Sequence, residues 1–260
     1  MPAPVTVGVS LKMYFGHADT LAWLDRVAAL VRSPGTVGDA VRDGAVELFV
    51  VPGYLAIPSA LGAFTGIPVL VGAQDLATED AGAYTGEVSG AELAEIGVRV
   101  AEVGHAERRH LYGDTDAIVA AKTMAALRNG LTPVLCVGES EQTGAQSAIT
   151  ACLEQLRSAL RDAAPGRVIV AYEPVWAIGA AVPASPEHAR AVCHAIRAEL
   201  DGHPGRPGSS IIYGGSAGPG TLSSLAPDVD GLFLGRFAHD PSALATVLAE
   251  AAEQAALRAA

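Results

Sequence analysis

The sequence predicts an α/β protein, a single-domain (β/α)8 barrel over residues 1–260. Eight short apolar segments alternate with longer amphipathic or alanine-rich stretches, a pattern that indicates parallel strands joined by right-handed helical crossovers. A chain of 260 residues also has the usual length of one such barrel. The segment Val9–Lys12 after the first expected strand lacks the glycine-rich phosphate turn that would favour an open, doubly wound sheet.

The strands are expected where runs of four to six residues, mostly apolar and rich in β-branched side chains, end at a polar or glycine-containing turn. In chain order they are Val5–Ser10, Val46–Val51, Pro68–Ala73, Val98–Val103, Pro133–Val137, Val168–Tyr172, Ser210–Tyr213 and Gly231–Leu234.

The helices are expected between these runs, where apolar residues recur at helical spacing or alanine is abundant. The clearest are Leu21–Arg32, Asp116–Arg128, Gln146–Asp162, Pro186–Leu200 and Pro241–Arg258. The last of them would close the barrel. Segment His203–Gly208, rich in proline and glycine, is expected to be a loop before the seventh strand, and no interdomain linker is apparent.

Composition narrows the classes of partner. The net charge of −11 argues against nucleic-acid binding and requires any anion site to be local. No apolar run is long enough to cross a membrane, because the most apolar region, Ala45–Phe64, contains Glu47 and is broken by prolines. Three widely spaced cysteines suit a reducing cytoplasm and have no metal-ligand spacing. Only Lys12 and Lys122 are lysines, so either could have a special role.

The ends of the expected strands bring chemically useful residues to one rim, because the carboxyl ends of barrel strands face the active site. Lys12 follows the first strand, His105 the fourth and Glu173 the sixth. A carboxylate such as Glu173 can remove a proton next to a carbonyl, while neutral His105 and charged Lys12 stabilise the carbonyl oxygen. Backbone N–H groups of the glycine-rich turns could hold a phosphate, namely those of Gly179, Gly215, Ser216 and Gly235.

These residues lie in motifs that resemble the triosephosphate isomerase family over nearly the whole chain. VGHAERR at 103–109 resembles its histidine motif, AYEPVWAIG at 171–179 its glutamate motif and lid, and YGGS at 213–216 its phosphate loop. By this resemblance Glu173 is the base, His105 the electrophile and Lys12 the charge at the substrate oxygen. The phosphate would be held by Gly179, Ser216 and Gly235, and no cofactor or metal is implied.

The same resemblance implies a homodimer. GAQ at 72–74 and YTGE at 84–87 resemble the family's third loop. Thr85 and Glu87 would reach across the interface, where Arg108 would receive Glu87 of the partner, and Tyr213 would latch the closed lid. The residues alone leave open whether Glu107 and Arg108 form a structural ion pair or take part in catalysis.

Five places depart from the usual family pattern. Ser10 stands in place of an asparagine and Arg236 in place of a second glycine, both where the substrate should sit. The other three are Ala106 beside the histidine, 180–182 at the far hinge of the lid, and 218–220 after the phosphate loop. Serine is shorter than asparagine and leaves room for one more carbon unit. Arg236 would add a charge-assisted contact to phosphate, at a cost of about 1–2 kcal/mol if its position requires positive φ.

The leading hypothesis is therefore interconversion of dihydroxyacetone phosphate and glyceraldehyde 3-phosphate through an enediol(ate). The alternative keeps this chemistry on a longer ketose phosphate such as an erythrulose phosphate, because of Ser10 and Arg236. A Schiff-base aldolase using Lys12 is disfavoured, since the lid motif around Glu173 has no role in it. A non-catalytic sugar-phosphate-binding barrel is disfavoured because the base is present.

Overall fold

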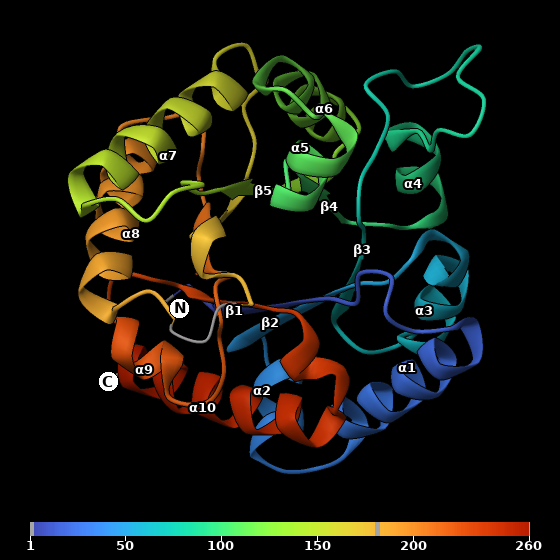
Figure 1. The fold of residues 1–260 in the computed structure, drawn as a ribbon. Helices are drawn as coiled ribbons and strands as arrows, with labels where there is room; N and C mark the ends of the chain where they lie inside the picture. The colour runs from blue at the N-terminus through green and yellow to red at the C-terminus, as the bar shows by residue number, and fades with distance from the viewer. Residues whose placement is uncertain (1–2, 180–182, 260) are drawn as a thin grey trace.

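The computed structural model describes residues 3–179 and 183–259, and its eight parallel strands close into a barrel ringed by helices (Figure 1). Neighbouring strands follow chain order, and β8 pairs with β1 to close the ring. The predicted fold class is thereby confirmed. The strands are β1 Val5–Ser10, β2 Val46–Val51, β3 Val69–Ala73, β4 Val100–Val103, β5 Thr132–Val137, β6 Ile169–Tyr172, β7 Ser210–Tyr213 and β8 Gly231–Leu234.

All five helices expected from the sequence are present, with ends that differ by at most four residues. They are α1 His17–Arg32, α6 Asp116–Arg128, α7 Ala145–Leu160, α8 Pro186–Asp201 and α10 Pro241–Ala259. The structure adds helices of five to seven residues, too short to show a helical period. These are α2 Thr36–Arg42, α3 Ile57–Ala63, α4 Gly90–Ile96, α5 Ala106–Tyr112 and α9 Thr221–Leu225. Three 3₁₀ turns complete the described elements: η1 Tyr54–Ala56, η2 Val175–Ala177 and η3 Arg236–His239.

Two apolar cores result from the alternation of side chains along each strand. One set of residues packs between the strands and the surrounding helices, as Val5, Val7 and Val9 of β1 do. The smaller set fills the barrel interior, for example Val100 of β4 and Ala171 of β6. Because side chains on one face recur every second residue, the same alternation directs Ser10, Glu102 and Glu173 toward the interior at the carboxyl ends of their strands.

Within residues 3–179 and 183–259, no helix combines the length and apolar character needed to cross a membrane. In the same part of the chain, no group of three or more His, Cys, Asp or Glu side chains is arranged to hold a metal ion.

Candidate active site

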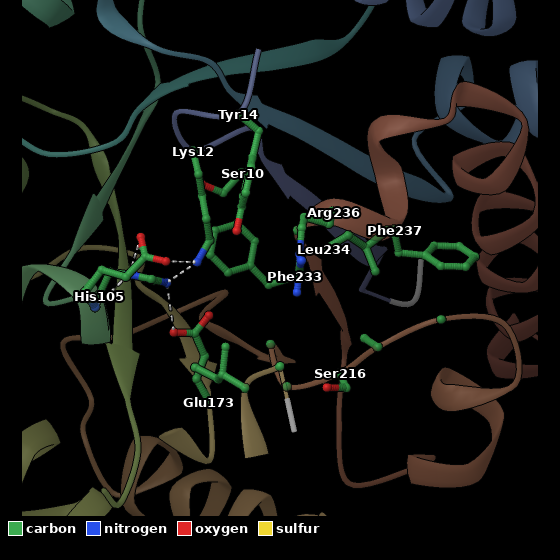
Figure 2. Close-up of a pocket in the computed structure, with 18 residues that line it drawn as sticks. Ser10, Lys12, Tyr14, His105, Glu173, Ser216, Phe233, Leu234, Arg236 and Phe237 are labelled. Atoms are coloured by element: carbon green, nitrogen blue, oxygen red, sulfur yellow. Dashed lines mark hydrogen bonds and ion pairs between the residues drawn. The ribbon is translucent and has the colours of Figure 1, made fainter. Parts of the chain in front are cut away.

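A cavity of about 440 Å³ opens at the carboxyl ends of the strands. Figure 2 shows Lys12, His105 and Glu173 grouped on one side of it, with Arg236 and Ser216 on the other. The catalytic and substrate-binding residues predicted from the sequence all border this one cavity: Ser10, Lys12, His105, Glu173, Gly179, Gly215, Ser216, Gly235 and Arg236. Their convergence from β1, β4, β6, β7 and β8 follows from the closure of the barrel.

His105 caps the N-terminus of α5, and this contact fixes its tautomer. The backbone N–H of Glu107 donates to Nδ1 of His105 at 3.1 Å, so the neutral imidazole carries its proton on Nε2. Burial and, to a smaller extent, the charge of Lys12 together lower the pKa of His105 to about 4, against the opposing charge of Glu107. At neutral pH the ring is therefore uncharged, with an N–H that can donate to a substrate oxygen.

Glu173 is held as a buried carboxyl with one free oxygen. Oε2 has no hydrogen-bond partner and lies 3.5 Å from Nε2 of His105. Burial raises the pKa of Glu173 to about 8, aided by the negative charge of Glu102 and opposed by Lys12. Gly214 makes room for this side chain, because a Cβ atom there would lie 2.7 Å from Oε1 of Glu173. The arrangement provides a strong base facing the cavity.

Lys12 adopts φ 49°, and it is the one non-glycine residue with positive φ in the described part of the chain. Such a conformation costs of order 1–3 kcal/mol and is typical of functional sites. Nζ donates to Oε1 of Glu107 at 2.8 Å and lies 3.1 Å from Nε2 of His105. Burial lowers the pKa of Lys12, but the bond to Glu107 and the charges of Glu173 and Glu102 outweigh it, so the net pKa is raised. The ammonium remains charged beside the two other groups.

Backbone and guanidinium donors lie on the opposite side of the cavity. Gly179 has φ 71°, a conformation suited to glycine, and Ser216 Oγ donates to the carbonyl oxygen of Ala177 at 3.2 Å. A Cβ atom at Gly179 would lie 3.8 Å from Nη2 of Arg236, whose guanidinium carbon is 5.8 Å from the centre of the Tyr14 ring. The Arg236 guanidinium therefore lies between Gly179 and Tyr14 at the border of the cavity. Its φ is not positive, so the strain considered for this position does not arise.

The segment that resembles the family's lid is hydrogen-bonded at its start to Glu139, which follows β5. Trp176 is half-buried, and its Nε1 donates to Oε1 of Glu139 at 2.7 Å. Glu139 also accepts from the hydroxyl of Tyr172 at 3.2 Å. The sequence departure at 180–182 lies outside the described residues.

The structure corrects the possible pairing of Glu107 with Arg108. Glu107 is bonded to Lys12 instead. Arg108 Nε contacts Asp75 at 2.8 Å and Asp114 at 3.2 Å, both in its own chain. Helix α5 separates the two side chains, because consecutive residues on a helix point in different directions.

Sequence reasoning missed Glu102 and Tyr14. Glu102 is 3% exposed and accepts a hydrogen bond from Ser10 Oγ at 3.0 Å. Burial raises its pKa to about 7, while the bond from Ser10 opposes the rise. The sequence feature that could have identified Glu102 is a carboxylate at an inward-facing position of an apolar strand, three residues before His105. Tyr14 was indistinguishable from an ordinary loop residue, although it borders the cavity beside Arg236.

A closed (β/α)8 barrel with a carboxylate, a neutral imidazole and an ammonium at its carboxyl-end mouth has the base and the oxygen-stabilising groups that an isomerase of the intramolecular oxidoreductase class requires. Comparison with known proteins identifies the family, because residues 5–251 match the sequence model of the family described as triosephosphate isomerase. The chain belongs to this family, whose substrates are small sugar phosphates.

Relatives within the family carry two different names. The chain is 47% identical to an L-erythrulose-1-phosphate isomerase of Pectobacterium atrosepticum over 251 residues, 95% of each protein. It is 40% identical to a triosephosphate isomerase of Symbiobacterium thermophilum over 219 residues, 80% of this chain and 85% of that one. The crystal structure of triosephosphate isomerase from Bartonella henselae superposes with a TM-score of 0.76 at 27% identity, covering 93% of this chain and 96% of that chain. Family membership alone therefore does not identify the particular sugar phosphate, and the residues of the site must be used to choose between the two.

Proposed function

We propose that the chain isomerises a four-carbon ketose phosphate of the erythrulose phosphate type. The observation that carries the proposal is that Ser10 and Arg236, the two departures expected to alter substrate choice, both border the cavity of Glu173. The 47% identity to a protein named L-erythrulose-1-phosphate isomerase supports the same substrate class. The alternative drawn from the sequence is thus better supported than interconversion of the three-carbon phosphates, which is not confirmed.

The proposed chemistry moves one proton between neighbouring carbons. Glu173 removes the proton from a hydroxyl-bearing carbon next to the carbonyl, and the electron pair forms an enediol(ate). Nε2–H of His105 and the ammonium of Lys12 stabilise the negative oxygen, because both lie within reach of one position beside Glu173. Glu173 then returns the proton to the adjacent carbon. The former hydroxyl oxygen gives up its proton and the former carbonyl oxygen takes one up, so the carbonyl has moved by one position. No cofactor or metal is needed for these steps.

A comparison of two substrates tests the proposal directly. The initial rates of the purified chain are measured with L-erythrulose 1-phosphate and with dihydroxyacetone phosphate, and kcat/KM is compared. We expect the four-carbon ketose phosphate to have the larger value. A larger value for dihydroxyacetone phosphate would instead favour the three-carbon reaction, which the 40% identity to a triosephosphate isomerase keeps as the second candidate.

Replacing Arg236 with glycine should change substrate choice. The guanidinium borders the cavity next to Gly179, so it can pair with phosphate oxygens and also occupies space there. We expect Arg236→Gly to raise KM for both substrates and to change the four-carbon to three-carbon ratio of kcat/KM by about 3- to 10-fold, equivalent to roughly 0.7–1.4 kcal/mol. The measurement is steady-state kinetics with both substrates on the variant and the wild type.

The control is Arg26→Gly on α1, an exposed arginine outside the cavity, matched in residue type. It should leave the ratio as it is in the wild type. If Arg236→Gly leaves the ratio and both KM values unchanged, the arginine has no part in substrate binding, and Ser10 remains as the sole predicted determinant.

We also propose a homodimer in which the third loop enters the partner. In Figure 1 the chain between β3 and α4 extends away from the barrel, and it contains the exposed Tyr84. A second cavity of about 540 Å³ beside the catalytic one is bordered by exposed apolar side chains, including Met13, Leu55, Leu111 and Tyr112. An apolar surface of this kind favours a protein partner, and the loop of a second copy would cover it.

Sedimentation velocity at micromolar concentration should show a dimer or a larger assembly built from dimers. Replacing Leu111 with glutamate should shift the protein toward monomer, because a charge would then be placed in the proposed interface. Glu95→Lys on α4 serves as a charge-changing surface control. A fully active monomer in the unmodified protein would contradict the proposal.

A cytoplasmic location is proposed on the basis of the cysteines. Cys136, Cys152 and Cys193 are all buried and free. Unpaired buried thiols suit a reducing compartment.

A further inference from the structure

The barrel interior holds a hydroxyl–carboxyl pair that the isomerisation described above does not use. We propose that Ser10 and Glu102 form a subsite that binds the hydroxyl of the substrate's terminal hydroxymethyl group, and that this subsite selects a four-carbon over a three-carbon ketose phosphate. The inference rests on the proposed function. It makes Ser10 and Glu102 specificity-determining residues in addition to the three groups that carry out proton transfer.

Ser10 and Glu102 form a buried, hydrogen-bonded pair at the site. Ser10 ends β1 and Glu102 lies in β4, on different walls of the barrel, and each is 3% exposed. Ser10 Oγ donates to Oε2 of Glu102 at 3.0 Å. Ser10 borders both the catalytic cavity and the second cavity, and Glu102 borders the second cavity together with His105. A polar ligand group in the catalytic cavity can therefore reach Ser10, whose hydroxyl is hydrogen-bonded to Glu102.

The position of Glu102 matches the additional group of the substrate. Oε1 of Glu102 lies 3.9 Å and Oε2 of Glu173 lies 3.5 Å from the same atom, Nε2 of His105. A substrate oxygen bound to Nε2 is therefore close to both carboxyls. In a four-carbon 2-ketose 1-phosphate, the hydroxyl-bearing carbon next to the carbonyl also carries the hydroxymethyl group. That group is one carbon–carbon bond from the atom on which Glu173 acts, and a three-carbon substrate has a hydrogen in its place.

The charge state of Glu102 suits recognition of a hydroxyl. Burial raises its pKa to about 7, so the protonated and ionised forms coexist near neutral pH. The ionised form accepts a hydrogen bond from a hydroxyl, and the protonated form can donate one. Burying such a pair costs free energy that apolar residues would not, which argues for a role in binding. A site built to bind a substrate hydroxyl discriminates against an analogue that lacks it, because the buried polar groups then lose a partner.

The test is the ratio of kcat/KM for L-erythrulose 1-phosphate to that for dihydroxyacetone phosphate in Ser10→Ala, Glu102→Leu and Glu102→Gln. We expect the ratio to fall at least about 10-fold in Ser10→Ala and Glu102→Leu, as loss of a hydrogen bond to a buried group would produce. It should fall less in Glu102→Gln, whose amide still bonds a hydroxyl. The ratio is used because removal of the negative charge of Glu102 also lowers the pKa of Glu173, which changes the rate with both substrates.

The chain supplies a matched control at the other end of β1. Thr6 Oγ1 donates to Oε1 of Glu47 at 3.5 Å, a part-buried hydroxyl–carboxyl pair outside the lining of the cavity. Thr6→Val should leave the ratio within about twofold of the wild-type value. A double variant, Ser10→Ala with Glu102→Leu, should lower the ratio less than the product of the single effects, because the two residues contact each other.

A binding measurement separates recognition from turnover. Calorimetric titration with erythritol 1-phosphate and with glycerol 3-phosphate, neither of which can react, should show that Glu102→Leu weakens binding of the longer ligand by about 10-fold relative to the shorter one. Unchanged ratios in all three single variants, with unchanged relative binding, would overturn the inference. A wild-type chain inactive on the four-carbon substrate would instead contradict the proposed function itself, so the two failures are distinguishable.

Discussion

Replacing Glu173 with aspartate should lower kcat by about 100-fold, because misplacing a reacting group by about 1 Å can cost that much. The aspartate side chain is one methylene shorter and withdraws the carboxylate from the carbon acid. In the unmodified protein Oε2 of Glu173 is free of hydrogen bonds and faces the cavity next to His105, so retraction removes no structural contact of that oxygen. The measurement is kcat for both sugar phosphates, with thermal unfolding monitored in parallel.

The control for this substitution is Glu141→Asp, the same change at an exposed residue before α7. It should leave kcat unaltered. We expect Glu173→Asp to unfold within a few degrees of the wild type, so that the rate loss is not a loss of folded protein. A nearly normal kcat in Glu173→Asp, with the control also normal, would remove Glu173 as the base and leave the proposed chemistry without its proton acceptor.

The backbone of the barrel was predictable because each strand is a continuous apolar run bounded by turn residues. Strands β1, β2, β7 and β8 have the predicted ends, and the remaining four differ by one or two residues at their starts. Short helices such as α9 Thr221–Leu225 contain too few residues for a periodic pattern. Their formation depends on packing against the barrel, and local sequence patterns carry no information about such tertiary contacts.

The site residues were predictable to the extent that they follow strand ends in recognisable motifs. All nine predicted catalytic and substrate-binding residues border one cavity, yet the side chains that they contact were not predicted. Lys12 donates a hydrogen bond to Glu107, which lies 95 residues further along the sequence. Ser10 donates one to Glu102, which lies 92 residues further along. Such pairings depend on the register between strands and on helix orientation. A sequence motif predicts that a residue lies at a strand end, but it does not predict which side chain from a distant part of the sequence that residue contacts.

Substrate choice is the part that sequence motifs left undecided, and the structure gives it a physical basis. Ser10 was noted for its small size, whereas the barrel shows that it is also a hydrogen-bond donor to a buried carboxyl. Arg236 was noted for its charge, and its guanidinium borders the cavity beside Tyr14. Specificity thus involves both sides of the cavity, while Glu173, His105 and Lys12 would provide chemistry common to either substrate.

Removing the ammonium of Lys12 should also have a large effect on catalysis. Lys12→Met should lower kcat/KM for either sugar phosphate by about 100-fold or more, the size of effect seen when one stabilising donor is removed from an active site. Nζ is 2.8 Å from Oε1 of Glu107 and 3.1 Å from Nε2 of His105, the atom proposed to bind the substrate oxygen. Methionine preserves the length and apolar stem of the side chain, so the loss reports the charge. Both residues are non-glycine, so the strain at φ 49° is similar in the two proteins.

A pH profile distinguishes this role from a structural one. Lys12 lowers the pKa of Glu173, which is about 8 in the unmodified protein, and of Glu102, which is about 7. Without the ammonium both pKa values should rise. Glu173 must be ionised to act as a base, so a higher pKa leaves less of the active form at a given pH, and the acidic limb of the kcat/KM profile should move to higher pH in Lys12→Met. Lys12→Arg, which keeps the charge, should leave this limb close to the wild-type position. If Lys12→Met keeps kcat/KM within about twofold at low salt and its profile is not shifted, the ammonium acts neither on the substrate nor on the base, and Lys12 serves the structure of the β1 loop alone.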